Sequence, residues 1–325
     1  MTDLPDSEIY DVIIVGGASA GLSAAIYTSR QQMRTLLISK DIGGQALLTN
    51  EIQNYPGFMS IGGFELMNKF QEQARAYGTE FLYDEVKSIE KDGNNFSVNT
   101  TSNKISALSL ILAFGKTPRD LGVPGEEKLK GRGVSYCAVC DGPLFKGKKV
   151  AVIGVGEQAY EAINYLSNVV GELLLIHKPP KLTAGGEIIS GMIENKRVNF
   201  LPSTEVVSVN GDKRIESITL KSSGGKTWDE KLDGIFVEIG YIAKSDFVKG
   251  IVDLNNKKEI ITNLDGTTST AGIFSCGDIT QIPYKQAVIS AGMGATAALS
   301  AYNYVQAKKG LIASRSDWKT IKAKI

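Results

Sequence analysis

Residues 10–39 of the chain read YDVIIVGGASAGLSAAIYTSRQQMRTLLIS. The apolar, β-branched run Tyr10–Val15 predicts a strand, and Gly16–Gly21 predicts a tight turn. An alanine-rich helix is expected over Leu22–Gln32, followed by a second strand at Thr35–Ser39. A strand, a glycine turn, a helix and a further strand in this order are typical of a βαβ unit that binds dinucleotides.

The glycine turn GGASAG fits the pattern G-x-G-x-x-G except that Ala18 takes the place of the central glycine. That glycine normally lets the backbone approach a pyrophosphate, so the added methyl group is expected to weaken this contact without removing it. Asp41, about 20 residues further on, is a candidate for the ribose hydroxyl groups. Glycine turns and loop aspartates also occur without a ligand, and that alternative stays open here. The candidate turn residues are Gly16, Gly17, Ala18, Ser19, Ala20 and Gly21.

The same pattern occurs a second time in residues 149–177. Lys149–Ile153 is strand-like, Gly154–Ala159 is a turn with the skeleton G-x-G-x-x-A, Tyr160–Val170 is helix-like and Glu172–His177 is strand-like. The sequence therefore predicts an α/β protein with two Rossmann-like nucleotide-binding domains of the three-layer ββα type.

A chain of 325 residues is long for one hydrophobic core and suits two domains. The strand-like Gly272–Ile279 and the helix-like Ala287–Gln306 are expected to belong to the first domain, because a Gly-Asp pair that ends a strand and opens a helix fits a ligand contact. The first domain is therefore predicted to be discontinuous. We expect it to comprise residues 1–118 and 246–325, and the second domain to span residues 119–245.

Composition excludes several classes of partner. The 36 Lys and Arg residues nearly balance the 35 Asp and Glu residues, so no overall field attracts nucleic acid or an anionic membrane. The apolar runs have the length of strands, well short of the roughly 20 residues of a membrane span. The N-terminal segment lacks the basic and apolar regions of a signal peptide. We therefore expect a cytoplasmic protein with no nucleic-acid or membrane partner.

Three cysteines are present, and Cys137 and Cys140 have the spacing C-x-x-C. In a reducing compartment this spacing is more typical of a catalytic or metal-binding pair than of a structural disulfide. A zinc site needs two further ligands, and only Cys276 and His177 remain, so no metal is expected. Beside a helix start, such a pair closes an easily reduced disulfide and favours the thiolate. Asp141 follows directly, where a carboxylate would also stabilise the helix dipole.

Four further motifs are Gly43–Gln45 (GGQ), Glu51–Gly57 (EIQNYPG), Ser135–Gly142 (SYCAVCDG), and Cys276–Asp278 (CGD) followed by Lys285–Val288 (KQAV). In order and spacing they resemble the low-molecular-weight thioredoxin reductase family, and the resemblance covers nearly the whole chain. The most specific motif is the C-A-V-C-D-G box at the start of the second domain. Relatives of the glutathione reductase type carry their cysteine pair near the first helix instead.

The resemblance implies an FAD cofactor and a redox-active disulfide. Cys140 would face the flavin, Cys137 would exchange with a thioredoxin-like protein, and Asp141 would donate and accept the proton of the outgoing dithiol. A homodimer is expected, and Cys276 is expected to be a buried, inert thiol. Beyond the first turn, the implied FAD-binding residues are Gln45 and Asn54 beside the flavin, Asp278 and Gln286 near the ribityl chain and ring, and Gly44, Gly115, Gly277, Lys285 and Ala287 around them.

The second glycine turn is followed by a departure from the family. The His-Arg-Arg…Arg box, whose guanidinium groups bind the 2′-phosphate of NADPH, reads HKPPKLTA at residues 177–184. Lysine lacks the planar fork of arginine, and two prolines stiffen the loop. Glu157 also places a carboxylate where a pyrophosphate would meet the helix, and GYIA at 240–243 replaces Gly-x-x-Pro-Asn. The acidic residue that would select NADH is absent as well, so NADPH and NADH are not the expected donors.

The sequence therefore predicts a flavoenzyme that reduces a thioredoxin-like protein with electrons from another donor. Ferredoxin is a candidate, since related flavoproteins accept electrons from it. Lys178, Lys181, Lys196 and Arg197 could form a local dock for an acidic ferredoxin, or they form only a solvated basic face. Three other functions stay open: a dithiol oxidase that passes electrons to oxygen, a conventional NAD(P)H-dependent thioredoxin reductase, and a flavin-bound sensor without turnover.

Overall fold

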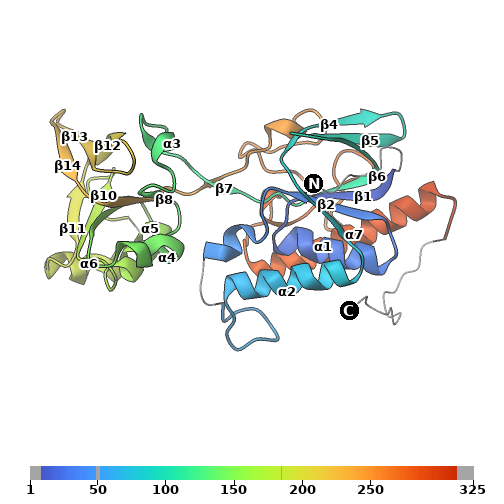
Figure 1. Ribbon diagram of the computed structural model, residues 1–325, viewed down its shortest axis with the longest axis horizontal. Helices are drawn as coiled ribbons and strands as arrows, with labels where there is room; N and C mark the ends of the chain where they lie inside the picture. Colours follow the sequence, from blue (N-terminus) through green and yellow to red (C-terminus); the bar gives the residue numbers. More distant parts are fainter. Residues whose placement is uncertain (1–8, 49–51, 184, 313–325) are drawn as a thin grey trace. The chain divides into compact units, whose positions relative to one another are not determined.

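The computed structural model describes residues 9–48, 52–183 and 185–312 (Figure 1). The chain forms two compact units, the first comprising Met1–Lys116 and Ala243–Ile325 and the second Thr117–Ile242. The boundaries proposed from the sequence lie within a few residues of these. Most of the N-terminal segment considered for a signal peptide lies outside the described residues, as does Glu51 of the EIQNYPG motif.

Unit 1 is built on a seven-stranded sheet with the order β3-β2-β1-β6-β5-β4, in which β17 also pairs with β6. The strands β3, β2, β1 and β6 are parallel, and β5 and β4 extend the sheet in antiparallel fashion. The bounds are β1 Tyr10–Val15, β2 Thr35–Ser39, β3 Glu80–Tyr83, β4 Val86–Asp92, β5 Asn95–Thr100, β6 Lys104–Leu112 and β17 Ile273–Ser275. Because β17 runs parallel to the end of β6, the C-terminal part of the chain completes the N-terminal domain.

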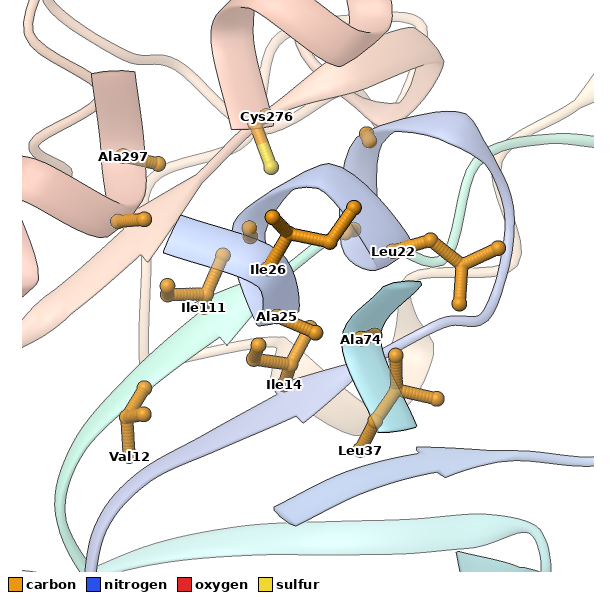
Figure 2. Close-up of a cluster of buried hydrophobic side chains, with 14 of the residues drawn as sticks. Val12, Ile14, Leu22, Ala25, Ile26, Leu37, Ala74, Ile111, Cys276 and Ala297 are labelled. Carbon is orange, nitrogen blue, oxygen red and sulfur yellow. The ribbon is translucent and has the colours of Figure 1, made fainter. Parts of the chain in front are cut away.

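Side chains of β1 alternate between two hydrophobic cores, as expected for a strand with both faces covered. Val12 and Ile14 pack with Ala25 of α1 in the core shown in Figure 2, to which α2 and α7 also contribute. Ile13 and Val15 belong to the core on the opposite face. The helices of unit 1 are α1 Ser19–Arg30, α2 Gly63–Ala76 and α7 Ala287–Lys308, with the 3₁₀ helices η1 Gly44–Leu48, η3 Asp246–Val248 and η4 Gly277–Ile279.

Unit 2 has a parallel five-stranded sheet, with helices on one face and a three-stranded antiparallel sheet on the other. The large sheet has the order β11-β10-β9-β15-β8, and the small one has the order β12-β13-β14. The strand bounds are β8 Val134–Ser135, β9 Lys149–Gly154, β10 Glu172–His177, β11 Asn199–Pro202, β12 Thr204–Asn210, β13 Ser217–Ser222, β14 Thr227–Lys231 and β15 Gly234–Glu238. The helices are α3 Glu126–Leu129, α4 Ala138–Asp141, η2 Gly142–Phe145, α5 Glu157–Leu166 and α6 Glu187–Glu194.

The chain passes between the units at two points, and the two crossing segments pair with each other. Strand β7, Thr117–Pro118, lies antiparallel to β16, Tyr241–Ile242. Within the described part of the chain, no helix is long and apolar enough to cross a membrane.

Several element boundaries differ from the predictions. Helix α1 begins at Ser19 and α5 at Glu157, inside the glycine motifs that we assigned wholly to turns. Gly277 and Asp278 open only the short helix η4, and the long helix α7 begins at Ala287. The helices therefore begin within the glycine motifs and not after them.

Candidate active site

The first glycine turn is packed so closely that its glycines have no room for side chains. A Cβ at Gly16 would lie 2.4 Å from the Ala113 carbonyl oxygen, and one at Gly21 would lie 1.9 Å from the Gly16 oxygen. Gly16 also has a φ of 114°, in the region that favours glycine. Helix α1 then begins at Ser19 with no side-chain cap and no acidic residue in its first turn. Uncapped amide N–H groups at the positive end of a helix dipole suit an anionic pyrophosphate.

Ala18, which replaces the central glycine, has extended backbone, and its methyl group faces the GGQ motif. A Cβ on Gly44 would lie only 2.9 Å from the Ala18 Cβ, and Gly44 itself has a φ of 53°. The N–H of Gly43 donates a hydrogen bond to the Gly17 oxygen at 2.8 Å. The methyl group is therefore accommodated by a glycine on the facing segment, and the GGQ motif is fastened to the first turn.

Other predicted FAD residues gather at the same place from distant parts of the chain. Gly277 packs on α1, since a Cβ there would lie 2.8 Å from the Ala20 Cβ. The Asn54 side chain donates a hydrogen bond to the Gln286 side-chain oxygen at 3.1 Å, which joins two residues 232 positions apart. Asp278 accepts a hydrogen bond from Ser290 of α7 at 3.0 Å. These contacts join the Asn54 motif to Gln286, and they join the CGD motif both to the start of α1 and to α7.

A partly buried ion pair connects these motifs to one another. Gln45 donates to the Lys116 carbonyl oxygen at 3.2 Å, and the Lys116 ammonium lies 2.6 Å from the Glu259 carboxylate. Lys285 lies 3.8 Å from Glu259 and donates to the carbonyl oxygen of Asp278 at 3.1 Å. Burial would raise the pKa of Glu259, but hydrogen bonds from Lys116 and Asn255 hold that pKa below its ordinary value. Burial also lowers the pKa of Lys285, with the neighbouring Lys116 adding to the shift.

The remaining predicted residues of this site lie at its edges. Gly115 has a φ of 62° and immediately precedes Lys116, while Ala287 is the first residue of α7. Asp41 is exposed in the loop after β2, and its carbonyl oxygen lies 3.0 Å from the position of a Cβ on Gly17. Asp41 as a ribose-binding residue stays a prediction.

In unit 2, Cys137 is disulfide-bonded and largely buried, at the start of the short helix α4. The Ser135 hydroxyl donates to the Asp141 carboxylate at 2.6 Å and accepts the Cys137 amide N–H at 3.1 Å. The Asp141 amide donates to the Cys137 carbonyl oxygen at 3.2 Å. Ser135 therefore ties Asp141 to the cysteine turn, so that the carboxylate is held within the C-A-V-C-D-G box.

The second glycine turn keeps the backbone geometry of a dinucleotide site but not its charge. A Cβ at Gly154 would lie 2.2 Å from the Glu238 carbonyl oxygen, whereas Gly156, with a φ of 76°, has open space around it. Helix α5 carries Glu157 in its first turn, where the first turn of α1 has no acidic residue. The first turn of α5 is therefore less suited to a pyrophosphate than that of α1.

The loop that follows β10 is held by hydrogen bonds and an ion pair of its own. His177 is buried, with its ring nitrogens 2.9 Å from the Gly154 oxygen and 3.0 Å from the Lys181 oxygen. The Thr183 amide donates to the Tyr160 hydroxyl at 2.9 Å. The Lys178 ammonium lies 2.9 Å from the Glu205 carboxylate, and both side chains are exposed. These contacts hold the loop after β10 in place.

Cys276 is fully buried as a free thiol, as predicted, and burial raises its pKa to about 12. In Figure 2 it lies in the hydrophobic core near Ile26. Among the described residues, no group of three or more His, Cys, Asp or Glu side chains could hold a metal ion. Chemistry at sulfur therefore centres on the turn around Cys137.

Two nucleotide-type domains, with a cysteine turn at the start of the second, define a disulfide oxidoreductase. The pyridine nucleotide-disulphide oxidoreductase family matches residues 10–298. A thioredoxin reductase of Bacillus subtilis (strain 168) is 38% identical over 307 residues, which cover 93% of this chain and 97% of the relative. The chain therefore belongs to the low-molecular-weight thioredoxin reductase family, and it is a flavoprotein oxidoreductase, as the motifs predicted.

Solved structures agree with this assignment. The crystal structure of Lactococcus lactis thioredoxin reductase in its FR conformation has a TM-score of 0.78 and 36% identity, and the match covers 91% of this chain and 99% of that one. A ferredoxin-flavin thioredoxin reductase from Clostridium acetobutylicum has a TM-score of 0.53 and 30% identity, with coverage of 93% and 99%. The predicted fold of two Rossmann-like domains is confirmed.

Sequence reasoning missed several side chains that organise the site. Ser135 was part of a quoted motif, but its bond to Asp141 was not foreseen. Lys116 and Glu259 lie 143 positions apart, and nothing in the sequence links them. Glu238, at the end of strand β15, was not among the predicted site residues, and burial raises its pKa to about 7. An acidic residue at the end of the apolar run GIFVE was the one signal available for it.

Proposed function

We propose that this protein passes electrons from bound FAD through a Cys137–Cys140 disulfide to a thioredoxin-like protein, and that a donor other than NADPH supplies them. The family membership supports a flavin-dependent reduction of thioredoxin. The observation that carries the choice of donor is the loop after β10. It has no arginine, and its first lysine, Lys178, is paired with Glu205.

The residues around the start of α1 suit FAD. The tight turn Gly16–Gly21 and the uncapped first turn of α1 would hold the pyrophosphate. Asn54 and Gln286, which already contact each other, would line the flavin from two segments, with Gln45 fastened to the Lys116 backbone beside them. FAD supplies the capacity to accept two electrons and pass them on. The chain positions the cofactor and its surroundings.

The cysteine turn handles the protons and the exchange. Reduction of a disulfide takes two electrons, and the leaving sulfur of the thioredoxin disulfide takes up a proton. Asp141 would exchange this proton, held in place by the Ser135 hydroxyl. Its bond to Ser135 also ties the carboxylate to the Cys137 amide, since Ser135 accepts that N–H. The proton site and the nucleophile would therefore keep a fixed relation through turnover.

Ferredoxin is the donor that we put forward. The likeness to a ferredoxin-flavin thioredoxin reductase supports it, and so does the group of exposed cations in unit 2. Lys178, Lys181, Lys196 and Arg197 are all exposed on or beside β10, α6 and β11. Exposed cations steer an acidic partner in a salt-dependent manner.

The test is an anaerobic assay of thioredoxin disulfide reduction with one donor at a time. Reduced ferredoxin should support turnover, and the rate should fall as salt is added, because screening weakens the steering of charged partners. NADPH and NADH should support no turnover above background. Turnover with NADPH that matches turnover with ferredoxin would contradict the proposal.

A conventional NADPH-dependent thioredoxin reductase is the second candidate. The retained geometry of Gly154 and Gly156 favours it, because both glycines keep the backbone shape of a dinucleotide turn. The same assay separates the two candidates. A third arm, oxygen consumption driven by a dithiol in the absence of thioredoxin, detects a dithiol oxidase.

A further inference from the structure

Glu126 is a buried carboxylate near the start of unit 2, outside the flavin motifs and the cysteine box. Only 3% of the residue is exposed. One of its carboxylate oxygens accepts the Leu121 amide N–H at 2.8 Å, and the other accepts the Gly122 amide N–H at 2.7 Å. A buried carboxylate is costly unless hydrogen-bond donors satisfy it. The two amides therefore fix the position of this side chain in the loop that leads into α3.

A third donor to Glu126 comes from the cysteine turn. The Tyr136 hydroxyl donates a hydrogen bond to the Glu126 carboxylate at 2.7 Å. Tyr136 lies between Ser135, the last residue of β8, and Cys137, which is disulfide-bonded. Burial and the neighbouring Glu126 both raise the pKa of Tyr136, so the hydroxyl keeps its proton and remains a donor. Glu126 therefore holds the residue that directly precedes a redox-active cysteine.

The loop that carries Glu126 packs against the small sheet of unit 2. A Cβ at Gly125 would lie 1.9 Å from the carbonyl oxygen of Val209 on β12. The Val209 amide donates to the Pro124 carbonyl oxygen at 2.9 Å. Gly125 also has a φ of 85°, in the region that favours glycine. The Tyr136 hydroxyl is therefore held from a loop that is itself fixed to a sheet.

Ser135 and Tyr136 are neighbours in the chain, but their hydroxyl groups bond to different carboxylates. Ser135 donates to Asp141, which belongs to the same short turn as Cys137. Tyr136 donates to Glu126, which belongs to a separate loop. The first bond moves with the turn if the turn changes shape. Only the second bond ties the turn to a part of the unit outside it.

We propose that Glu126 is a positioning residue for the cysteine turn, acting through the Tyr136 hydroxyl, and that it favours the disulfide over the dithiol. The inference rests on the proposed function, since it takes the Cys137 disulfide to be redox-active. The hydroxyl bond and the disulfide restrict the same short stretch of backbone. When one of them is in place, the other forms at a smaller cost in conformational entropy. Loss of the hydroxyl bond should therefore shift the equilibrium toward the reduced form.

The equilibrium can be followed with dithiothreitol under anaerobic conditions, without donor or thioredoxin. The two thiols of dithiothreitol lose two electrons and two protons and close a ring disulfide. The protein disulfide gains the two electrons and opens, and its two sulfurs take up two protons. The oxidised and reduced forms then differ by two cysteines that can be alkylated. The free Cys276 is labelled in both forms once the protein is unfolded.

The experiment compares flavin-loaded wild type and Tyr136→Phe at neutral pH. Phenylalanine keeps the ring, whose centre lies 5.6 Å from the Lys130 ammonium, and removes only the hydroxyl. The variant should favour the reduced form by about threefold, an effect of the order of one net hydrogen bond. This change corresponds to about 14 mV in reduction potential. Flavin absorbance and a melting curve establish that each protein is folded.

Unit 1 offers a matched control. The hydroxyl of the buried Tyr10 donates to the Glu80 carboxylate at 2.7 Å, and Arg34 lies 4.5 Å from the centre of the Tyr10 ring. Tyr10→Phe therefore removes the same kind of bond from a tyrosine with a similar cationic neighbour. It should lower the melting temperature to a similar degree as Tyr136→Phe. Its cysteine equilibrium should be that of wild type.

A second variant tests whether the Tyr136 hydroxyl acts through Glu126. Asp120 is the other carboxylate that interacts with this hydroxyl, and it pairs with Lys130 at 3.0 Å. Glu126→Asp keeps the charge but shortens the side chain by one methylene, so that the carboxylate no longer reaches the hydroxyl and both amides together. In this background Tyr136→Phe should shift the equilibrium by less than it does in wild type.

Each other outcome contradicts a stated part of the proposal. A Tyr136→Phe equilibrium equal to that of wild type, or shifted toward the disulfide, would overturn it while leaving the redox pair intact. An equal shift in Tyr10→Phe would also overturn it, because the effect would then be general. An undiminished shift in the Glu126→Asp background would exclude Glu126 as the anchor. If wild type shows three labelled cysteines at every dithiothreitol ratio, the pair forms no disulfide in solution, and the proposed function itself fails.

Discussion

The two glycine turns of this protein have the same backbone plan but different surroundings. In unit 1 the turn Gly16–Gly21 is packed against backbone on several sides, and polar side chains from distant segments gather beside it. In unit 2 the turn Gly154–Ala159 keeps its shape, yet it has Glu157 at the helix start and a lysine paired to Glu205 beyond it. Strand and helix packing preserve the shape of a turn, whereas the loops around it decide which ligand it binds.

The strongest test of this difference between the two glycine turns is to add one methyl group to each of them. In Gly21→Ala the new Cβ would overlap the Gly16 carbonyl oxygen, so we expect a loss of more than about 3 kcal/mol in stability and loss of bound flavin. Gly156→Ala meets nothing within 4 Å and should cost about 1–3 kcal/mol, from its backbone conformation alone. Purified holoprotein yield and thermal melting measure both. Flavin retained at wild-type level in Gly21→Ala would contradict the account of the first turn.

The second comparison concerns ion pairs. Glu259 is 8% exposed in its side chain and neutralises Lys116, so Glu259→Gln leaves the partly buried Lys116 ammonium without this counter-charge. We expect a loss of about 3 kcal/mol. In unit 2, Glu230→Gln removes one of two carboxylates that pair with Lys149 nearer the surface and should cost less than about 1 kcal/mol. Chemical denaturation at neutral pH measures both, and equal losses would show that burial does not separate the two pairs.

The third prediction concerns the cysteine turn. Ser135→Ala removes the hydroxyl that holds Asp141, and we expect thioredoxin turnover to fall about tenfold with little change in flavin content. Ser208→Ala serves as the control, since that hydroxyl donates to the Asn210 side chain in the small sheet of unit 2. A Ser135→Ala variant with wild-type turnover would mean that Asp141 needs no such support.

The smallest expected effect concerns how folding stability depends on pH, since Glu259 and Glu238 should contribute with opposite signs. The pKa of Glu259 is lowered in the folded state, so its contribution to stability is present above its unfolded value and is lost as the pH falls. The pKa of Glu238 is raised to about 7, so wild type should gain stability as the pH falls from above 7 toward the ordinary glutamate value. We expect Glu238→Gln to reduce this gain by about 1 kcal/mol, after allowance for partial exposure. Melting temperatures of both proteins across this pH range test the prediction. A wild-type melting temperature that falls with the pH, relative to that of Glu238→Gln, would contradict the raised pKa of Glu238.

Much of the fold could be predicted because the two βαβ units carry local patterns. Apolar runs, glycine turns and alanine-rich helices follow one another within about 30 residues. The start of α1 at Ser19 and of α5 at Glu157 was missed because a helix begins inside a glycine motif, and the motif alone does not show where. Propensity alone could not place these starts, since serine favours both turns and helix caps and the glycines beside it oppose a helix.

The candidate site was predictable only where a motif carries it. The cysteine box and the flavin motifs are short sequence motifs that can be recognised individually, and the fold brings several of them together. The contacts that organise them arise from folding instead. The pairing of Lys116 with Glu259 and the bond from Ser135 to Asp141 depend on how distant segments come together in the fold. No local pattern encodes such contacts, because each joins residues from different elements.

The central claim is that the loop after β10 sets the electron donor, and the flavin spectrum tests it most directly. Anaerobic wild-type holoprotein should keep its yellow flavin absorbance in about 1 mM NADPH, the upper end of ordinary KM values. The double variant Lys178→Arg with Pro179→Arg places two guanidinium groups in the loop after β10, where we propose that arginines would bind the 2′-phosphate, and NADPH should bleach its flavin. Rapid bleaching of the wild-type protein by NADPH would contradict the claim.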